Sequence, residues 1–98
     1  MPTINAKYEA VFIFSMTLGE EGISAMKEKF QTLIEQNAEL GEVEEWGKRR
    51  LAYLINDEAD GYYMLYNFVG GPAFPAELER VAKITDGVLR TMVIRKED

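Results

Sequence analysis

Apolar residues recur along this chain at two spacings, and each spacing predicts one kind of element. Alternation at every second position, among aromatic and β-branched side chains, predicts β-strands over residues 7–14, 43–55, 62–69 and 88–95. Spacings of three and four residues predict two amphipathic helices. The apolar stripe of the first is Ile23, Met26, Phe30, Leu33 and Ile34, and that of the second is Leu78, Val81 and Ala82. The predicted order of elements is therefore βαββαβ.

Polar residues and residues with special backbone preferences predict where these elements begin and end. Thr17 and Glu20 have the spacing of a capping box at the start of the first helix. Asn37 tolerates the left-handed conformation and predicts the end of that helix, while Pro75 suits the first turn of the second helix. The polar segment 56–61 predicts a turn, so the second and third strands form a hairpin.

This order of elements predicts an α+β fold, the ferredoxin-like sandwich, in a single domain spanning residues 1–98. Two strand–helix–strand units interlock to give a four-stranded antiparallel sheet with both helices on one face. The first and third strands are expected in the centre of the sheet. The long second strand is expected at an edge.

Alternation divides the strand residues between the two faces of this sheet. The helix-facing row of the third strand is expected to be the more apolar one: Tyr62, Met64, Tyr66 and Phe68. Because helices would cover these rings, stacking of single-stranded RNA bases on them is disfavoured. An apolar patch for a protein partner is predicted on the opposite face, formed by Val11, Ile13, Tyr63, Leu65, Met92 and Ile94. A scatter of singly exposed apolar groups is the alternative.

The composition argues against most kinds of catalytic and metal site. The chain contains neither Cys nor His, so thiol nucleophiles, disulfides, thiolate metal sites and the usual acid–base group at neutral pH are missing. Gly70-Gly71 lies outside any phosphate-loop motif, and no acidic segment has the spacing of a calcium loop. We therefore expect a binding protein without enzyme activity, cofactor, metal or small-molecule substrate. No segment has the character of a membrane span or signal peptide, so a cytoplasmic location is expected.

The net charge of −6 conceals an asymmetry between the two halves of the chain. Residues 1–45 carry three basic and nine acidic side chains, whereas residues 46–98 carry eight of each. Basic residues of the second half gather at 48–50 and near the C-terminus. One interpretation is an acidic surface that keeps the protein soluble. The other is a polarised molecule with one basic edge that meets phosphate.

The basic run lies in the segment Trp46–Tyr53 (WGKRRLAY), on the predicted edge strand. Alternation places Lys48 and Arg50 on the same face as Trp46, with Arg49 on the opposite face. Gly47 indicates a bulge or a close backbone approach. Cations on an edge strand discourage edge-to-edge pairing, and they also neutralise RNA phosphates. The residue types alone leave both interpretations open.

From Lys7 to Lys96, the order and spacing of several motifs resemble a bacterial family of small-subunit ribosomal proteins, the S-six (S6) family. The most specific motif is the block from Glu45 to Tyr53, followed by Ile55. The other matching positions are Lys7-Tyr8-Glu9, Gly61-Tyr62-Tyr63, Ile84, Val88-Leu89-Arg90 and Met92-Val93. Some members carry a basic residue where Leu89 stands, so fewer RNA contacts are expected from the last strand.

The resemblance implies the ferredoxin-like fold, a place in the cytoplasmic ribosome and binding to the central domain of 16S ribosomal RNA. It also implies a heterodimer with the basic ribosomal protein S-eighteen (S18), which would supply much of the phosphate contact that an acidic chain lacks. Carried over by motif position, the implied RNA-binding residues are Lys7, Tyr8, Lys48, Arg49, Arg50, Arg90, Arg95 and Lys96. A regulatory module of the same fold, binding a small ligand or itself, is the alternative from a different class.

Overall fold

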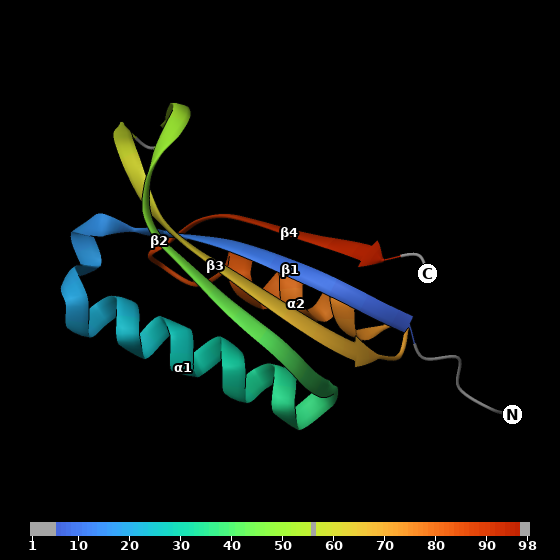
Figure 1. Cartoon of the computed structure of the whole chain (residues 1–98). Coiled ribbons are helices and arrows are strands. Elements are labelled where there is room, and N and C mark those ends of the chain that lie inside the picture. Colours follow the sequence, from blue (N-terminus) through green and yellow to red (C-terminus); the bar gives the residue numbers. More distant parts are fainter. Residues whose placement is uncertain (1–5, 56, 97–98) are drawn as a thin grey trace, which may run out of the picture.

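The structure, a computed structural model, describes residues 6–55 and 57–96 (Figure 1). Its strands are β1 (Ala6–Ser15), β2 (Glu39–Ile55), β3 (Glu58–Gly70) and β4 (Val88–Lys96). Its α-helices are α1 (Gly19–Asn37) and α2 (Phe74–Lys83), and a short 3₁₀ helix, η1 (Met16–Leu18), joins β1 to α1. The predicted order βαββαβ is confirmed.

The four strands form one antiparallel sheet in the order β2-β3-β1-β4. The first and third strands are therefore central and the long second strand is an edge, as predicted. β1 suits a central position because apolar residues occupy both of its faces, with Phe12 and Phe14 on one and Val11 and Ile13 on the other. Figure 1 shows that the β2–β3 hairpin extends past the ends of β1 and β4 and is strongly twisted relative to them.

The hydrophobic core lies between one face of the sheet and both helices. Every second residue of the two central strands enters it, together with one stripe from each helix. These residues are Tyr8, Ala10, Phe12, Phe14, Met64, Tyr66 and Phe68 from the sheet, and Ile23, Phe30, Ile34, Phe74, Leu78 and Ala82 from the helices. The Phe12 ring centroid lies 4.5 Å from that of Phe30 and 5.6 Å from that of Tyr66. Both helices thus cover the same face, which confirms the ferredoxin-like arrangement.

The start of α1 differs from the prediction. The backbone N–H of Thr17 donates to Ser15 Oγ at 3.2 Å, so Ser15 caps η1, while α1 follows Leu18 without a side-chain cap. Ser15 Oγ also donates to the Glu58 carboxylate at 2.8 Å. The capping box predicted at Thr17 and Glu20 is wrong because Thr17 lies inside η1, and Leu18 rather than Thr17 occupies the N-cap position of α1.

The helix end and the hairpin turn also differ in detail. α1 ends at Asn37 as predicted, but Asn37 does not adopt the left-handed conformation; its Nδ2 donates to the Leu33 carbonyl at 2.9 Å. β2 and β3 each begin earlier than predicted, and Ile55 pairs with Glu58. The predicted turn over 56–61 is therefore too long, and its residue 56 lies outside the described residues. Asp57, at φ 65°, provides the left-handed turn residue.

Candidate nucleic-acid interface

The basic segment of β2 is interrupted by a β-bulge. The pairing between β2 and β3 steps from Glu45 opposite Met64 to Gly47 opposite Tyr63, so β2 carries one extra residue. Gly47 has φ 79°, a conformation that side chains disfavour and glycine adopts freely. Of the two alternatives that Gly47 indicated, a bulge or a close backbone approach, the bulge is confirmed.

The bulge changes which side chains share a face of the sheet. Lys48 and Arg50 lie opposite positions of β3 that face the helices, so both side chains leave β2 on the helix side of the sheet. Trp46 was predicted to accompany them, and this placement is wrong. Its ring stacks on Tyr63 of the open face, with centroids 6.2 Å apart and 21° between the planes, and the Arg49 guanidinium lies 5.4 Å from the Trp46 ring centre. The physical reason is the extra residue, which reverses the alternation between Trp46 and Lys48.

The far end of β2 folds back over the open face. Leu51 is buried beside Ile13, and a cavity of about 100 Å³ there is also lined by Tyr53 and Arg90. Arg90 Nη1 donates a hydrogen bond to the Tyr53 hydroxyl at 2.6 Å. This contact joins β4 to β2 across the two central strands. It brings Arg90 to the same end of the open face as Arg49.

The other end of the open face carries a second basic group. Lys7 of β1 and Lys96 of β4 lie opposite each other, and Lys96 Nζ is 3.2 Å from Glu9 Oε1. Lys96 lies six positions beyond Arg90 on β4, which corresponds to about 20 Å along the strand. The predicted RNA-binding cations of the open face therefore form two groups, one at each end.

Tyr8 and Arg95 form a pair on the helix-covered side of the same sheet end. Tyr8 is 7% exposed, and its ring stacks on Phe68 with centroids 5.5 Å apart. The ring belongs to the core and offers no free surface on which an RNA base could stack, so its position argues against the predicted RNA contact. Arg95 is exposed, but its side chain leaves β4 on the opposite face of the sheet from the side chain of Lys96.

Between the two basic groups lies the predicted apolar patch, which we call the central strip. It consists of Val11, Ile13, Tyr63, Leu65, Met92 and Ile94, in adjacent rows of β3, β1 and β4. Ile13 and Leu65 are covered by their neighbours, whereas Met92 is 42% and Ile94 50% exposed. The accessible part of the central strip is therefore concentrated on β4. Trp46 adds a further exposed apolar surface on β2.

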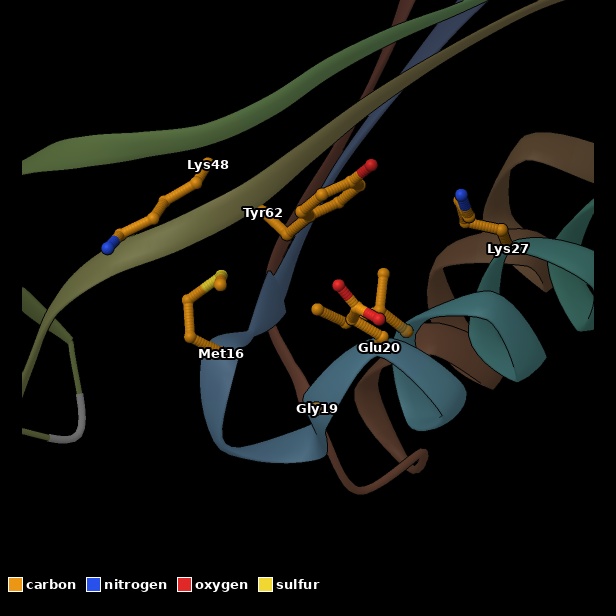
Figure 2. Close-up of a pocket in the computed structure, with 7 residues that line it drawn as sticks. Met16, Gly19, Glu20, Lys27, Lys48 and Tyr62 are labelled. Carbon is orange, nitrogen blue, oxygen red and sulfur yellow. The ribbon is translucent and has the colours of Figure 1, made fainter.

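A larger pocket of about 460 Å³ lies on the helix side of the sheet, between the start of α1 and the strands β2 and β3 (Figure 2). Lys48 is the one predicted site residue that lines it. Lys27 also lines it, but this cation lies 3.1 Å from the Glu45 carboxylate and 5.5 Å from the centre of the Tyr62 ring. Glu20 adds a carboxylate to the wall, so the charges of the pocket nearly balance and give no clear preference for an anion.

Within residues 6–55 and 57–96, no three His, Cys, Asp or Glu side chains gather closely enough to hold a metal ion. No helix in that part of the chain is both long and apolar enough to cross a membrane. Burial, and secondarily the charge of Glu45, raise the pKa of Tyr66, but this hydroxyl lies in the core.

One known family matches almost the whole chain. Its description is Ribosomal protein S6, and the match covers residues 7–95. The chain belongs to the ribosomal protein S6 family. The resemblance inferred from the motifs is confirmed, and the family consists of ribosomal proteins rather than enzymes, in agreement with the prediction of a non-catalytic protein.

Individual relatives within the S6 family are similar over nearly their full length. The chain is 50% identical over 91 residues to the small ribosomal subunit protein bS6 of Clostridium novyi, covering 92% of this chain and 96% of that protein. It is 47% identical over 92 residues to bS6 of Caldanaerobacter subterraneus, covering 93% and 97% respectively. The crystal structure of 30S ribosomal protein S6 from Thermotoga maritima matches with a TM-score of 0.89 at 26% identity, covering 95% of this chain and 89% of that one.

Two side chains of this S6-family surface were not predicted as part of it. Trp46 contacts Arg49, and a bulge placed on the N-terminal side of Gly47 would have put both on the open face. Tyr53 contacts Arg90 across 37 positions of sequence, and no local pattern signals this hydrogen bond. Each of these two aromatic side chains contacts an arginine that was predicted to bind RNA.

Proposed function

We propose that this chain is a structural constituent of the small ribosomal subunit that binds the central domain of 16S ribosomal RNA together with ribosomal protein S18. The observation that carries the proposal is the arrangement of the open sheet face. An apolar strip, exposed at Met92 and Ile94, lies between two groups of cations. One face thus offers surfaces for two kinds of partner, a protein and an RNA.

Arg49 and Arg90 are the side chains best placed for RNA phosphates. Both lie at one end of the open face, and a guanidinium can bind two phosphate oxygens at once. Lys7 and Lys96 provide point charges at the other end of the face. These four cations are therefore assigned as the principal RNA contacts.

The remaining predicted cations face a different direction. Lys48 and Arg50 leave β2 on its helix side, and Lys48 lies 4.0 Å from Asp60. Arg95 leaves β4 on the helix side as well. RNA that lies on the open face reaches these side chains only by bending around an edge strand, so we expect them to contribute less to affinity.

The central strip is assigned to S18. Burial of the exposed surfaces of Met92 and Ile94 would favour association, since apolar area removed from water stabilises a complex. The net charge of −6 disfavours binding of the isolated chain to RNA. A basic protein partner neutralises this charge and adds phosphate contacts of its own.

The test is the affinity of the full chain for a central-domain fragment of 16S ribosomal RNA, measured with and without S18 at several salt concentrations. Much tighter, salt-sensitive binding is expected when S18 is present, because each phosphate contact releases counterions. Equal affinity with and without S18 would refute the cooperative part of the proposal.

Variants test which cations contact the RNA. Arg49→Ala and Arg90→Ala should each weaken binding by about tenfold or more, since a charged hydrogen bond contributes about 1.5–3 kcal/mol. Arg80→Ala is the matched control, because Arg80 lies on α2 and is paired with Glu77. It makes the same change in net charge away from the open face. Equal losses in all three variants would show that net charge alone matters.

A further inference from the structure

The guanidinium of Arg49 rests on an aromatic platform that is itself anchored to the sheet. Trp46 stacks on Tyr63 at 6.2 Å between ring centroids, and Arg49 lies 5.4 Å from the Trp46 ring centre. The indole Nε1 of Trp46 also donates to Glu44 Oε1 at 3.4 Å. A cation over an indole face is attracted by the ring's electron density. The bulge at Gly47 makes this possible by placing Trp46 and Arg49 on one face.

Arg90 is held by a different aromatic side chain. Its Nη1 donates to the Tyr53 hydroxyl at 2.6 Å, and Tyr53 lies on the part of β2 that folds back over the open face. This bond uses one of the five N–H donors of the guanidinium, which leaves the others for a phosphate. Tyr53 is 61% exposed, so its ring adds little to the core.

We propose that Trp46 and Tyr53 are positioning residues that hold Arg49 and Arg90 in place for RNA phosphates; this inference rests on the RNA-binding function proposed above. A free arginine loses rotamer freedom when it binds, and a side chain that is already oriented loses less. The two aromatic residues therefore raise RNA affinity without contacting RNA themselves.

Tyr53→Phe is the sharpest test because it removes only the hydroxyl group. In the complex of central-domain RNA and S18, this variant should bind RNA about 2- to 10-fold more weakly, the range expected when one rotamer-rich side chain must be ordered on binding. In an Arg90→Ala background the same substitution should have no further effect. Thermal unfolding of Tyr53→Phe should be close to that of the parent chain, since the hydroxyl lies at an exposed site.

Trp46 is tested by the same cycle with Arg49. Trp46→Ala should weaken RNA binding in the parent chain and leave it unchanged in an Arg49→Ala background. Trp46→Phe retains an aromatic face for the guanidinium and should keep most of the parent affinity for RNA. This second variant tests the role of Trp46 even if Trp46→Ala folds poorly. A smaller slope of log affinity against log salt in Trp46→Ala, with the parent slope in Trp46→Phe, would support a lost phosphate contact.

The outcomes separate the inference from the function on which it rests. If Arg49→Ala and Arg90→Ala weaken binding but the aromatic substitutions add to them independently, the positioning role is refuted and the RNA site stands. If the two arginine variants bind RNA as well as the parent chain does, the assignment of these arginines fails, and the positioning role fails with it.

Discussion

Gly61 of β3 lies against the side chain of Ile13 of β1, and the space between them admits no methyl group. A Cβ atom built on Gly61 falls well inside van der Waals contact of Ile13 Cγ2 and lies 3.4 Å from Leu51 Cδ2. Ile13 of β1 and Leu51 of β2 are both buried, and they line the same small cavity as Tyr53 and Arg90. The missing side chain at Gly61 thus leaves room for the side chains of Ile13 and Leu51.

Gly61→Ala is therefore expected to destabilise the protein. Overpacking of this kind costs about 1–3 kcal/mol, and the β-branched Ile13 cannot swing its Cγ2 away cheaply. Ile13→Ala removes that atom, so the double variant should lose less than the sum of the two single variants. Chemical denaturation of all four proteins measures the coupling. Strictly additive losses would show that the two residues do not interfere.

Ser15, rather than Thr17, is expected to be the important hydroxyl between β1 and α1. Ser15→Ala removes the cap of η1 and the hydrogen bonds to Glu58, and a lost cap alone costs about 0.5–2 kcal/mol. Thr17→Ala removes one contact between hydroxyl groups and should cost less. Glu20→Ala is the control for the capping box: it removes only a first-turn carboxylate and should cost at most about 0.3–1 kcal/mol. A larger loss for Thr17→Ala, measured by thermal or urea unfolding, would contradict this account of the helix start.

The fold could be predicted from the sequence because its elements have consistent patterns. The alternation in β1 and the helical spacing of Phe30 and Ile34 each identify one buried face, and that face is where the core lies. The start of α1 could not be predicted in the same way. Ser15 and Thr17 are both good capping residues, and the choice between them depends on Glu58, which is 43 positions from Ser15.

The candidate site was only partly predictable for a related reason. Arg49 and Arg90 could be predicted as RNA-binding residues from the family motifs. The face on which Trp46 lies, however, depends on one extra residue in β2. Gly47 signals that a bulge exists, although the sequence does not show on which side of Gly47 the alternation changes. The hydrogen bond from Arg90 to Tyr53 depends on how the hairpin end folds back, which is a property of the whole sheet.

Tyr66 should make the stability of the protein depend on alkaline pH. Burial, followed by the charge of Glu45, raises the pKa of its hydroxyl in the folded protein. In the unfolded chain the pKa is about 10. The neutral form is thus favoured by folding, so its contribution is complete below about pH 10 and is lost as the pH rises further toward the folded pKa.

Tyr66→Phe isolates this contribution. The hydroxyl of Tyr66 donates to the Lys27 carbonyl at 2.9 Å, and its loss should cost about 1 kcal/mol near neutral pH. The difference in unfolding free energy between parent and variant should be constant from neutral pH to about pH 9 and shrink above about pH 10. Urea unfolding at several pH values measures it. A difference that grows with pH would contradict the direction of the pKa shift.

The exposed part of the central strip should determine binding to S18 without determining the fold. Met92→Asp and Ile94→Asp place a carboxylate on a partly exposed surface of β4, so each variant should lose about 1 kcal/mol of stability and still fold. A carboxylate buried in an interface without a partner is costly, and each variant should therefore bind S18 at least about tenfold more weakly.

Ile84→Asp provides the matched control for these two variants. Ile84 is 69% exposed and lies just after α2, outside the central strip. The substitution makes the same change in charge at an exposed apolar side chain, and it should leave S18 binding unchanged. Calorimetric titration of S18 into each variant gives the affinities. Full affinity in both strip variants would place the protein partner on a different surface, such as the outer edge of β2. An equal loss in Ile84→Asp would show that the added negative charge alone weakens binding, and would also contradict the assignment of the central strip.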